Sequence, residues 1–181
     1  MSVRNGFDVR NRDRIVSPES FFSKRRLPVS AVLDNVRSAF NVGNMFRTAD
    51  AARMERLYLC GCTPCPSNPK IEKTALGAER YVPWEYFPDA ADLIAGLKRD
   101  GMFIVAMETA GASEPFYDAD LPAGTVFVLG TEVDGLGEGI LSLADAVVEL
   151  PSLGMKNSLN VGNAFAIAVY EFLRRYGVER L

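Results

Sequence analysis

The sequence contains no histidine among its 181 residues. This absence excludes Ser-His-Asp triads, Cys-His pairs, histidine-ligated metals and histidine as a general base. The count of three cysteines is odd, which does not fit a disulfide framework. Cys60, Cys62 and Cys65 form a C-x-C-x-x-C cluster, but a closed zinc site needs one more sulfur or nitrogen ligand than this cluster provides. We therefore expect reduced thiols and no metal.

Long apolar runs are also absent, because none reaches the roughly 18 residues that cross a bilayer. The polar residues 1–14 lack the apolar region of a secretory signal. These absences predict a cytoplasmic protein with no membrane partner. The chain is 48% hydrophobic and 24% charged, which is enough to bury a core, and its length suits one domain better than two.

The net charge of −3 is unevenly distributed. Residues 1–26 hold seven basic and three acidic residues, so this extension carries +4 and the remainder carries −7. We predict a basic extension over 1–26 and a folded domain over 27–181. The extension is either a solvated tail, which charge alone favours, or an arm that binds a polyanion such as RNA. In the second case the RNA-binding residues are Arg10, Arg12, Arg14, Lys24, Arg25 and Arg26.

Short apolar runs bounded by Gly, Pro, Asp or Arg predict strands. They cover Val29–Leu33, Leu57–Cys60, Met102–Ala106, Thr125–Leu129 and Ala146–Leu150. Helical spacing of apolar residues predicts helices over Phe40–Met54, over Ala90–Lys98, and from Val161 to a stop at Gly177. Continuous apolar strands that alternate with helices indicate an α/β fold, in which helices cover both faces of a parallel sheet.

The first unusual segment is Leu33–Asp50, where a strand leads into Asn41-Val42-Gly43-Asn44 and then Arg47. An ordinary interpretation makes Asn41 a helix cap, Gly43 a packing position and Arg47 a partner in a surface ion pair. Arg47 lies among apolar residues in the sequence, however. We therefore expect its head group near a packed face or the edge of a cleft.

The second segment, Val126–Leu136, follows a strand that ends at Leu129. Ligands bind beyond the carboxyl ends of parallel strands, and glycines such as Gly130 and Gly135 let a ligand approach the backbone. The glycine spacing matches neither a dinucleotide fingerprint nor a P-loop. Glu132 either contacts a ligand amine or caps a helix that begins near Gly137.

The third segment, Glu149–Asn163, also follows a strand, and Ser158 and Asn160 precede the last helix. A tight loop that enters a helix offers unpaired backbone N–H and C=O groups, which suit the base edge of a nucleoside. Taken alone, Ser158 or Asn160 is explained as an N-cap. The three segments together predict a binding site, because all of them would converge on one edge of the sheet.

The three segments resemble, in order, motifs 1, 2 and 3 of the SpoU (TrmH-like) branch of the SPOUT superfamily of RNA ribose methyltransferases. The resemblance covers roughly residues 28–175. The matching residues are Asn41-Val42-Gly43 with Arg47, Leu129-Gly130-Thr131-Glu132 with Gly135, Leu150-Pro151 with Gly154, Ser158-Leu159-Asn160-Val161, and the stretch Lys73–Ala78.

This resemblance implies an α/β fold whose C-terminal segment forms a deep trefoil knot. It implies S-adenosylmethionine as the cofactor, held mostly by backbone groups. It also implies a homodimer whose active site is shared across the interface. The cofactor-binding residues it implies are Thr109, Leu129, Gly130, Leu150, Ser158 and Leu159.

The implied reaction is methyl transfer to a ribose 2′-hydroxyl, most readily in tRNA and otherwise in rRNA. Arg47 matches the family's catalytic arginine, Asn41 would orient it or the ribose, and Glu132, Asn160 and Ser158 would shape the site. Since a guanidinium does not give up its proton, we expect Arg47 to stabilise the developing alkoxide while an RNA phosphate accepts the proton. Three alternatives stay open: an inactive knotted RNA-binding protein, a base-nitrogen methyltransferase of the same fold, and an unrelated α/β nucleotide-binding enzyme.

Overall fold

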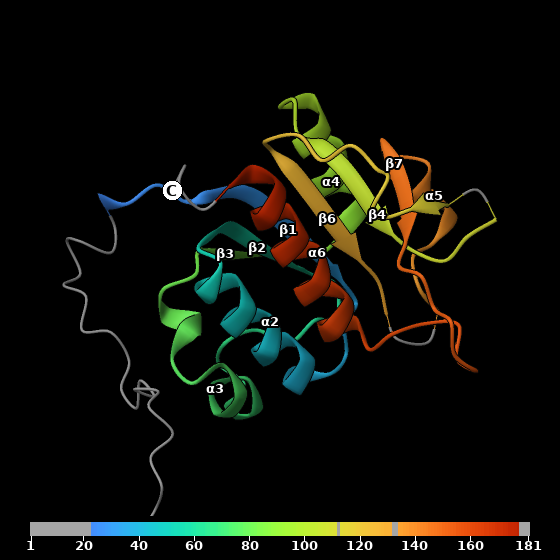
Figure 1. The fold of residues 1–181 in the computed structure, drawn as a ribbon. Coiled ribbons are helices and arrows are strands. Elements are labelled where there is room, and N and C mark those ends of the chain that lie inside the picture. Colours follow the sequence, from blue (N-terminus) through green and yellow to red (C-terminus); the bar gives the residue numbers. More distant parts are fainter. Residues whose placement is uncertain (1–22, 112, 132–133, 178–181) are drawn as a thin grey trace, which may run out of the picture.

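The computed structural model describes residues 23–111, 113–131 and 134–177. In these ranges, seven parallel strands form one sheet in the order β3-β2-β1-β6-β4-β7-β5 (Figure 1). The strands are β1 Leu27–Asp34, β2 Met54–Cys60, β3 Trp84–Phe87, β4 Phe103–Met107, β5 Glu114–Pro115, β6 Thr125–Leu129 and β7 Ala146–Glu149.

Helices pack on both faces of this sheet. They are α2 Ala39–Ala51, α3 Pro69–Ala75, the 3-10 helix η1 Ala78–Arg80, α4 Ala90–Arg99, α5 Glu138–Leu141 and α6 Val161–Tyr176. Helices α2, α3 and α6 lie over one face with one hydrophobic core, and α4 and α5 cover the other face with a second core. The prediction of a parallel α/β sheet covered on both sides is therefore confirmed. No helix in the described part of the chain is both long and apolar enough to cross a bilayer.

Strand β1 explains why the strands appear as continuous apolar runs. Its residues Ala31 and Leu33 pack under α2 and α6, whereas Val32 packs toward α4. All three are completely buried, because successive side chains of a strand point to opposite faces and both faces are covered.

The predicted helix over Phe40–Met54 is too long at its C-terminal end. Helix α2 ends at Ala51, Arg53 adopts a left-handed conformation with φ of 53°, and Met54 already begins β2 and pairs with Leu27. The pattern analysis did not predict α3, β3 and β5. Strand β3 sits at the edge of the sheet with Trp84 and Tyr86 exposed, so it lacks the apolar run that marks a buried strand.

The last two elements bring distant parts of the chain together. Strand β7 lies beyond β4, yet α6 packs on α2, β1 and β6. Residues 150–160 therefore cross the carboxyl end of the sheet before α6 begins (Figure 1). Asn160 caps α6, since its Oδ1 accepts a hydrogen bond of 3.0 Å from the backbone N–H of Gly162.

Candidate active site

A cavity of about 600 Å³ lies at the carboxyl ends of β4, β6 and β7. This is the edge at which parallel α/β sheets bind ligands. Its described walls come from residues 107–109, 129–131, 134–135, 148–150, 152, 157–161 and 164, so the second and third unusual segments converge as expected. All residues that the family resemblance assigns to the cofactor line this cavity, namely Thr109, Leu129, Gly130, Leu150, Ser158 and Leu159.

The described side chains of the cavity carry negative charge only. Glu108, Asp134 and Glu149 belong to the lining, and no lysine or arginine does. Carboxylates gathered in a concave, partly desolvated site favour a cationic ligand over an anionic one. The hydroxyl and amide side chains of Ser158 and Asn160 complete the polar part of the wall.

Glu108 fixes the loop that follows β6, a role that the sequence analysis missed. Its Oε2 accepts a hydrogen bond of 2.8 Å from the N–H of Leu136, and its Oε1 accepts one of 3.0 Å from the N–H of Thr109. Gly135 has φ of +66°, and a Cβ there would overlap the Glu108 carboxylate. The available signal was the position of Glu108 two residues after the predicted strand Met102–Ala106.

Asn41 connects the first segment to this cavity. Asn160, which lines the cavity, donates a hydrogen bond of 3.2 Å from Nδ2 to Oδ1 of Asn41. The interpretation of Asn41 as a helix cap is wrong, because Ser38 caps α2 and accepts a hydrogen bond of 3.3 Å from the N–H of Asn41. Asn41 thus lies in the first turn of α2, hydrogen-bonded to the N-cap residue of α6.

Arg47 lies away from the cavity of its own chain. Its side chain is exposed, it is absent from the lining residues, and it makes no hydrogen bond or ion pair in the described ranges. Arg47 shares the exposed, outward face of α2 with Phe40 and Asn44, so the expected position near a packed face or the edge of a cleft stays a prediction. Glu132 and the predicted RNA-binding residues Arg10, Arg12 and Arg14 lie outside the described residues.

The described end of the basic extension packs against the domain. The Arg26 guanidinium donates to the carbonyls of Met54 and Tyr81 at 3.1 and 3.2 Å, and burial lowers the pKa of Arg26. Arg25 lies 6.0 Å from the ring centroid of Tyr176. Lys24 is exposed, and its carbonyl accepts a hydrogen bond from Arg53. Arg25 and Arg26 therefore contact the folded domain as well as belonging to the basic extension.

The cysteine cluster lies at the carboxyl end of β2, whose last residue is Cys60. Cys60 is buried and Cys62 is exposed. Burial, followed by the charges of Asp34 and Asp89, raises the pKa of Cys60 to about 12, so this thiol stays protonated at neutral pH. Within the ranges that the structure describes, no group of three or more metal-binding side chains is placed to hold an ion.

One known protein family matches the part of the chain that forms this site. The sequence profile of the SpoU rRNA Methylase family matches residues 28–170. This chain belongs to that SpoU family. The match includes Asn41, Gly130 and Asn160, which the fold brings to one end of the sheet.

Curated SpoU relatives act on two kinds of RNA according to their names. The 23S rRNA (guanosine-2'-O-)-methyltransferase RlmB of Pseudomonas syringae is 31% identical over 84% of this chain, which spans 61% of that protein. The tRNA (guanosine(18)-2'-O)-methyltransferase of Thermus thermophilus is 28% identical over 87% of this chain and 80% of the relative. The chain is thus shorter than both relatives, and spans less than two thirds of the first.

Solved SpoU structures have the same fold. The TrmH/SpoU tRNA modifying enzyme of A. aeolicus has a TM-score of 0.78 at 29% identity, covering 86% of this chain and 78% of that one. The AdoMet-bound rRNA methyltransferase of Sinorhizobium meliloti has a TM-score of 0.76 at 28% identity, covering 83% of this chain and 60% of that one.

Proposed function

We propose that this protein transfers a methyl group from S-adenosylmethionine to a ribose 2′-hydroxyl of tRNA or rRNA. The observation that carries the proposal is the cavity at the carboxyl ends of β4, β6 and β7, where the family motifs converge. Both named relatives are RNA 2′-O-methyltransferases, and they support this reaction class.

The cavity suits S-adenosylmethionine in charge and in size. Its three described carboxylates complement a ligand that carries a sulfonium cation, and its volume of about 600 Å³ lies in the range of small-molecule sites. Leu129, Leu150 and Leu159 offer apolar contacts, and the backbone around Gly130 and Ser158 offers hydrogen-bonding groups for a nucleoside. When bound, S-adenosylmethionine would supply the methyl group from its sulfonium, and the demethylated, neutral thioether would be the leaving group.

The chain's own residues polarise and orient the 2′-hydroxyl, which is a poor nucleophile until it loses its proton. The Arg47 guanidinium stabilises the negative charge that develops on the 2′-oxygen, because it stays protonated and carries five N–H donors. An RNA phosphate held by Arg47 accepts the proton. Asn41, fixed by Asn160, orients the ribose or Arg47, while Ser158 and Glu132 shape the pocket.

The protein acts as a homodimer, in which Arg47 of one protomer reaches the cavity of the other. The exposure of Arg47 and its absence from its own cavity support this arrangement. A single chain leaves the guanidinium on the outer face of α2, so the active site is complete only when a second copy is present.

The crossing of residues 150–160 forms the deep trefoil knot of the SPOUT superfamily. The return of the chain from β7 to the face that carries α2 and α6 supports this topology. Mechanical stretching from both termini tests it. A knotted chain should remain shorter than the full contour length of about 3.6 Å per residue, whereas a simple chain should reach that length.

The replacement Arg47→Ala tests the catalytic role. We expect unchanged S-adenosylmethionine affinity by calorimetry and a loss of about 100-fold or more in single-turnover methylation, since a stabiliser of the developing charge is removed. Arg99→Ala, which removes an exposed arginine from α4, should leave both quantities unchanged. Undiminished transfer by the Arg47 variant would refute this role.

Mixed dimers test the shared site. Thr109→Arg should block the cavity, so neither this variant nor Arg47→Ala should transfer methyl groups alone. After subunit exchange, hybrid dimers contain one intact cavity opposite one intact Arg47, and roughly a quarter of wild-type activity should return. No recovery in a mixture with proven exchange would show that Arg47 serves its own chain.

Mapping of the product separates the remaining alternatives. Total RNA from a strain that lacks the protein is incubated with labelled S-adenosylmethionine, and the labelled nucleotide is identified by nuclease digestion. A 2′-O-methylated nucleotide supports the proposal and identifies the RNA. A methylated base would replace the proposal with base-nitrogen chemistry, and cofactor binding without transfer to any RNA would indicate an inactive binding protein.

A further inference from the structure

A groove of about 500 Å³ lies between α4 and the edge of the sheet that β3 forms. The apolar part of its lining comes from Tyr58 of β2, Phe87 of β3, and Leu93 and Leu97 of α4. Helix α4 covers the face of the sheet opposite α2. The groove is therefore on the side of the molecule away from the helix that faces the second protomer in the proposed homodimer. We call it the α4 groove.

The α4 groove carries negative charge that the described residues do not balance. Four carboxylates belong to its lining, and Glu85 pairs with Arg56. The other three, Asp89, Asp92 and Asp100, are exposed and form no salt bridge in the part of the chain that the structure describes. Arginine suits such a groove, because its aliphatic stem packs along apolar surface while its head group reaches a carboxylate.

Helix α4 places two of these carboxylates at the two ends of one helix face. Asp92, Gly96 and Asp100 follow one another at intervals of four residues, and all three line the groove. The eight residues from Asp92 to Asp100 rise about 12 Å along the helix axis, since each residue of an α-helix adds about 1.5 Å. A partner with two cationic groups at this separation would meet both carboxylates.

Gly96 leaves the middle of this face open. Glycine destabilises a helix interior relative to alanine, so its place in α4 calls for a reason. Packing within the described residues gives none, because an added Cβ would meet only the end of the Arg99 side chain, at 3.8 Å. The absence of a side chain at this position lets another polypeptide approach the helix backbone closely.

The basic extension has a charge pattern of matching length. Arg10, Arg12 and Arg14 occupy every second position of the sequence. In an extended chain, side chains two residues apart point to the same side. Arg10 and Arg14 would then be about 13 Å apart, since each residue of an extended chain adds about 3.3 Å. This separation matches the one between Asp92 and Asp100 along α4.

The extension joins the domain beside the strands that line the groove. Arg26 donates hydrogen bonds to the carbonyls of Met54, the first residue of β2, and Tyr81, which precedes β3. The nine residue steps from Arg14 to Ser23 can extend to about 30 Å. This reach exceeds the length of β2, whose seven residues rise about 23 Å. The arginines can therefore reach the α4 groove of their own chain.

We propose that the α4 groove is the docking site for residues 9–16 of the same chain. Asp100 ends α4 at the sheet edge where the extension joins, so Arg14 pairs with Asp100 and Arg10 pairs with Asp92. This inference does not depend on methyl transfer, because it concerns only the contact between the extension and the domain. Docked arginines are withheld from other anions, so a polyanion that binds them must first displace the arm from the groove.

Tryptic digestion of the full chain tests the docking. The rate of cleavage after the three arginines of the arm follows the undocked population when docking is fast. With Asp92→Asn and Asp100→Asn together, we expect cleavage about tenfold faster than in the wild type, because tethering at a millimolar effective concentration keeps the intact groove mostly occupied. Asp89 is retained because it caps α4. Urea unfolding verifies that the variant is folded.

Gly96→Leu separates the groove from its charge. Leucine adds bulk at the open position, favours the helix and leaves the net charge unchanged, so cleavage should again become about tenfold faster. The matched charge control is Asp118→Asn with Asp120→Asn, which removes two exposed carboxylates from the loop after β5 and should leave cleavage unchanged. Unchanged cleavage in either groove variant, or equal acceleration in the control, overturns the proposal.

A zero-length crosslink identifies the contacts. In the variants Arg14→Lys and Arg10→Lys, a carbodiimide condenses the introduced amine with an adjacent carboxylate, and the peptides are identified by mass spectrometry. We expect crosslinks from position 14 to Asp100 and from position 10 to Asp92. Crosslinks to carboxylates outside the groove, or between chains that carry different isotope labels, would overturn docking of the arm on its own chain.

Discussion

Glu108 occupies the space that a side chain at position 135 would need. Its two carboxylate oxygens accept hydrogen bonds from the backbone N–H groups of Leu136, which follows β6, and Thr109, which follows β4. Gly135 also closes a turn, since its N–H donates to the carbonyl of Thr131 at 3.1 Å. The Glu108 carboxylate and Gly135 therefore hold the described part of the segment that follows β6 in place.

Gly135→Ala should damage this arrangement. An alanine at position 135 would have to adopt a left-handed φ, and its Cβ would overlap the Glu108 carboxylate. We therefore expect the free energy of unfolding to fall by about 1 kcal/mol or more. The affinity for S-adenosylmethionine should fall as well. Urea unfolding and calorimetry measure the two effects. Gly139→Ala is the control, because its Cβ would meet open space in α5, and it should retain both stability and affinity.

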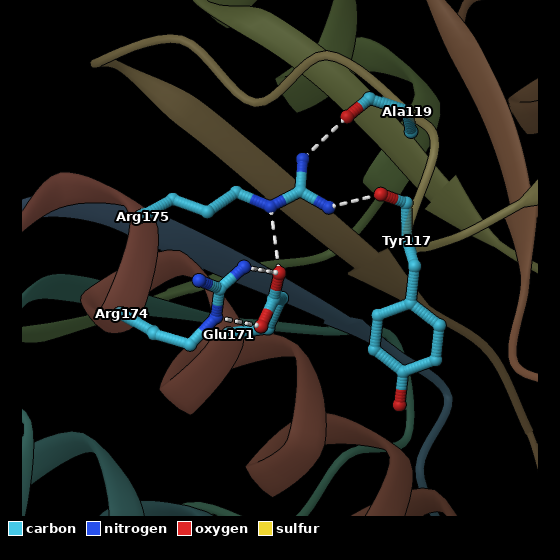
Figure 2. A network of polar contacts seen from close by, with 5 residues as sticks. All are labelled: Tyr117, Ala119, Glu171, Arg174 and Arg175. Carbon is cyan, nitrogen blue, oxygen red and sulfur yellow. Dashed lines mark hydrogen bonds and ion pairs between the residues drawn. The ribbon is translucent and has the colours of Figure 1, made fainter.

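At the scale of elements, hydrogen bonds hold both ends of α6. Asn160 ties its beginning to Asn41, and Arg175 ties its end to the loop after β5 (Figure 2). The Arg175 guanidinium donates to the carbonyls of Ala119 and Tyr117, both at 2.6 Å, and to Glu171 at 2.7 Å. These contacts hold the helix that follows the crossing segment and that contributes Val161 and Ala164 to the cavity lining.

Substitution of Asn160 separates capping from positioning. Asn160→Ala should lower stability by about 1 kcal/mol through loss of the N-cap. Asn160→Asp keeps a capping oxygen at a helix N-terminus, so its stability should match the wild type. An aspartate at position 160 cannot donate a hydrogen bond to Oδ1 of Asn41, so the methylation rate of the Asp variant should fall. Denaturant unfolding and single-turnover assays measure both, and wild-type transfer by the Asp variant would rule out positioning by Asn160.

Glu171 makes the end of α6 sensitive to acid. Hydrogen bonds from Arg174, opposed by burial and supported by Arg175, lower the pKa of Glu171 to about 2 (Figure 2). A lowered pKa stabilises the folded state above the unfolded value near 4.3, and this contribution disappears as the pH falls toward 2. The stability difference between wild type and Glu171→Gln, measured by urea unfolding, should therefore shrink between about pH 5 and pH 2. A constant difference over this range would contradict the assignment.

At the scale of the whole molecule, the net positive charge of residues 1–26 makes this extension a candidate arm for RNA. If the extension binds phosphates, Arg10→Gln, Arg12→Gln and Arg14→Gln together should flatten the salt dependence of tRNA binding by about one unit of slope per lost contact. An unchanged slope would make the extension a solvated tail.

The strands and the cavity were the most predictable parts of the molecule. Thr125–Leu129 was predicted with the bounds that the structure has, because a buried parallel strand forms a continuous apolar run. The short strand β3 escaped prediction, since its Trp84 and Tyr86 are exposed at an edge. Leu150 and Leu159 were predicted to share a site, and both line the cavity.

The sequence by itself determined the buried central strands, the main helices, the order of the three motifs and membership of the SpoU family, because these depend on apolar periodicity and on short motifs. Only the tertiary structure decided where the side chains outside the strands point. It turned Arg47 outward, brought Glu108 against Gly135, and placed Lys70 beside Phe40. Each of these outcomes depends on packing between segments far apart in the sequence, and no local pattern records such contacts.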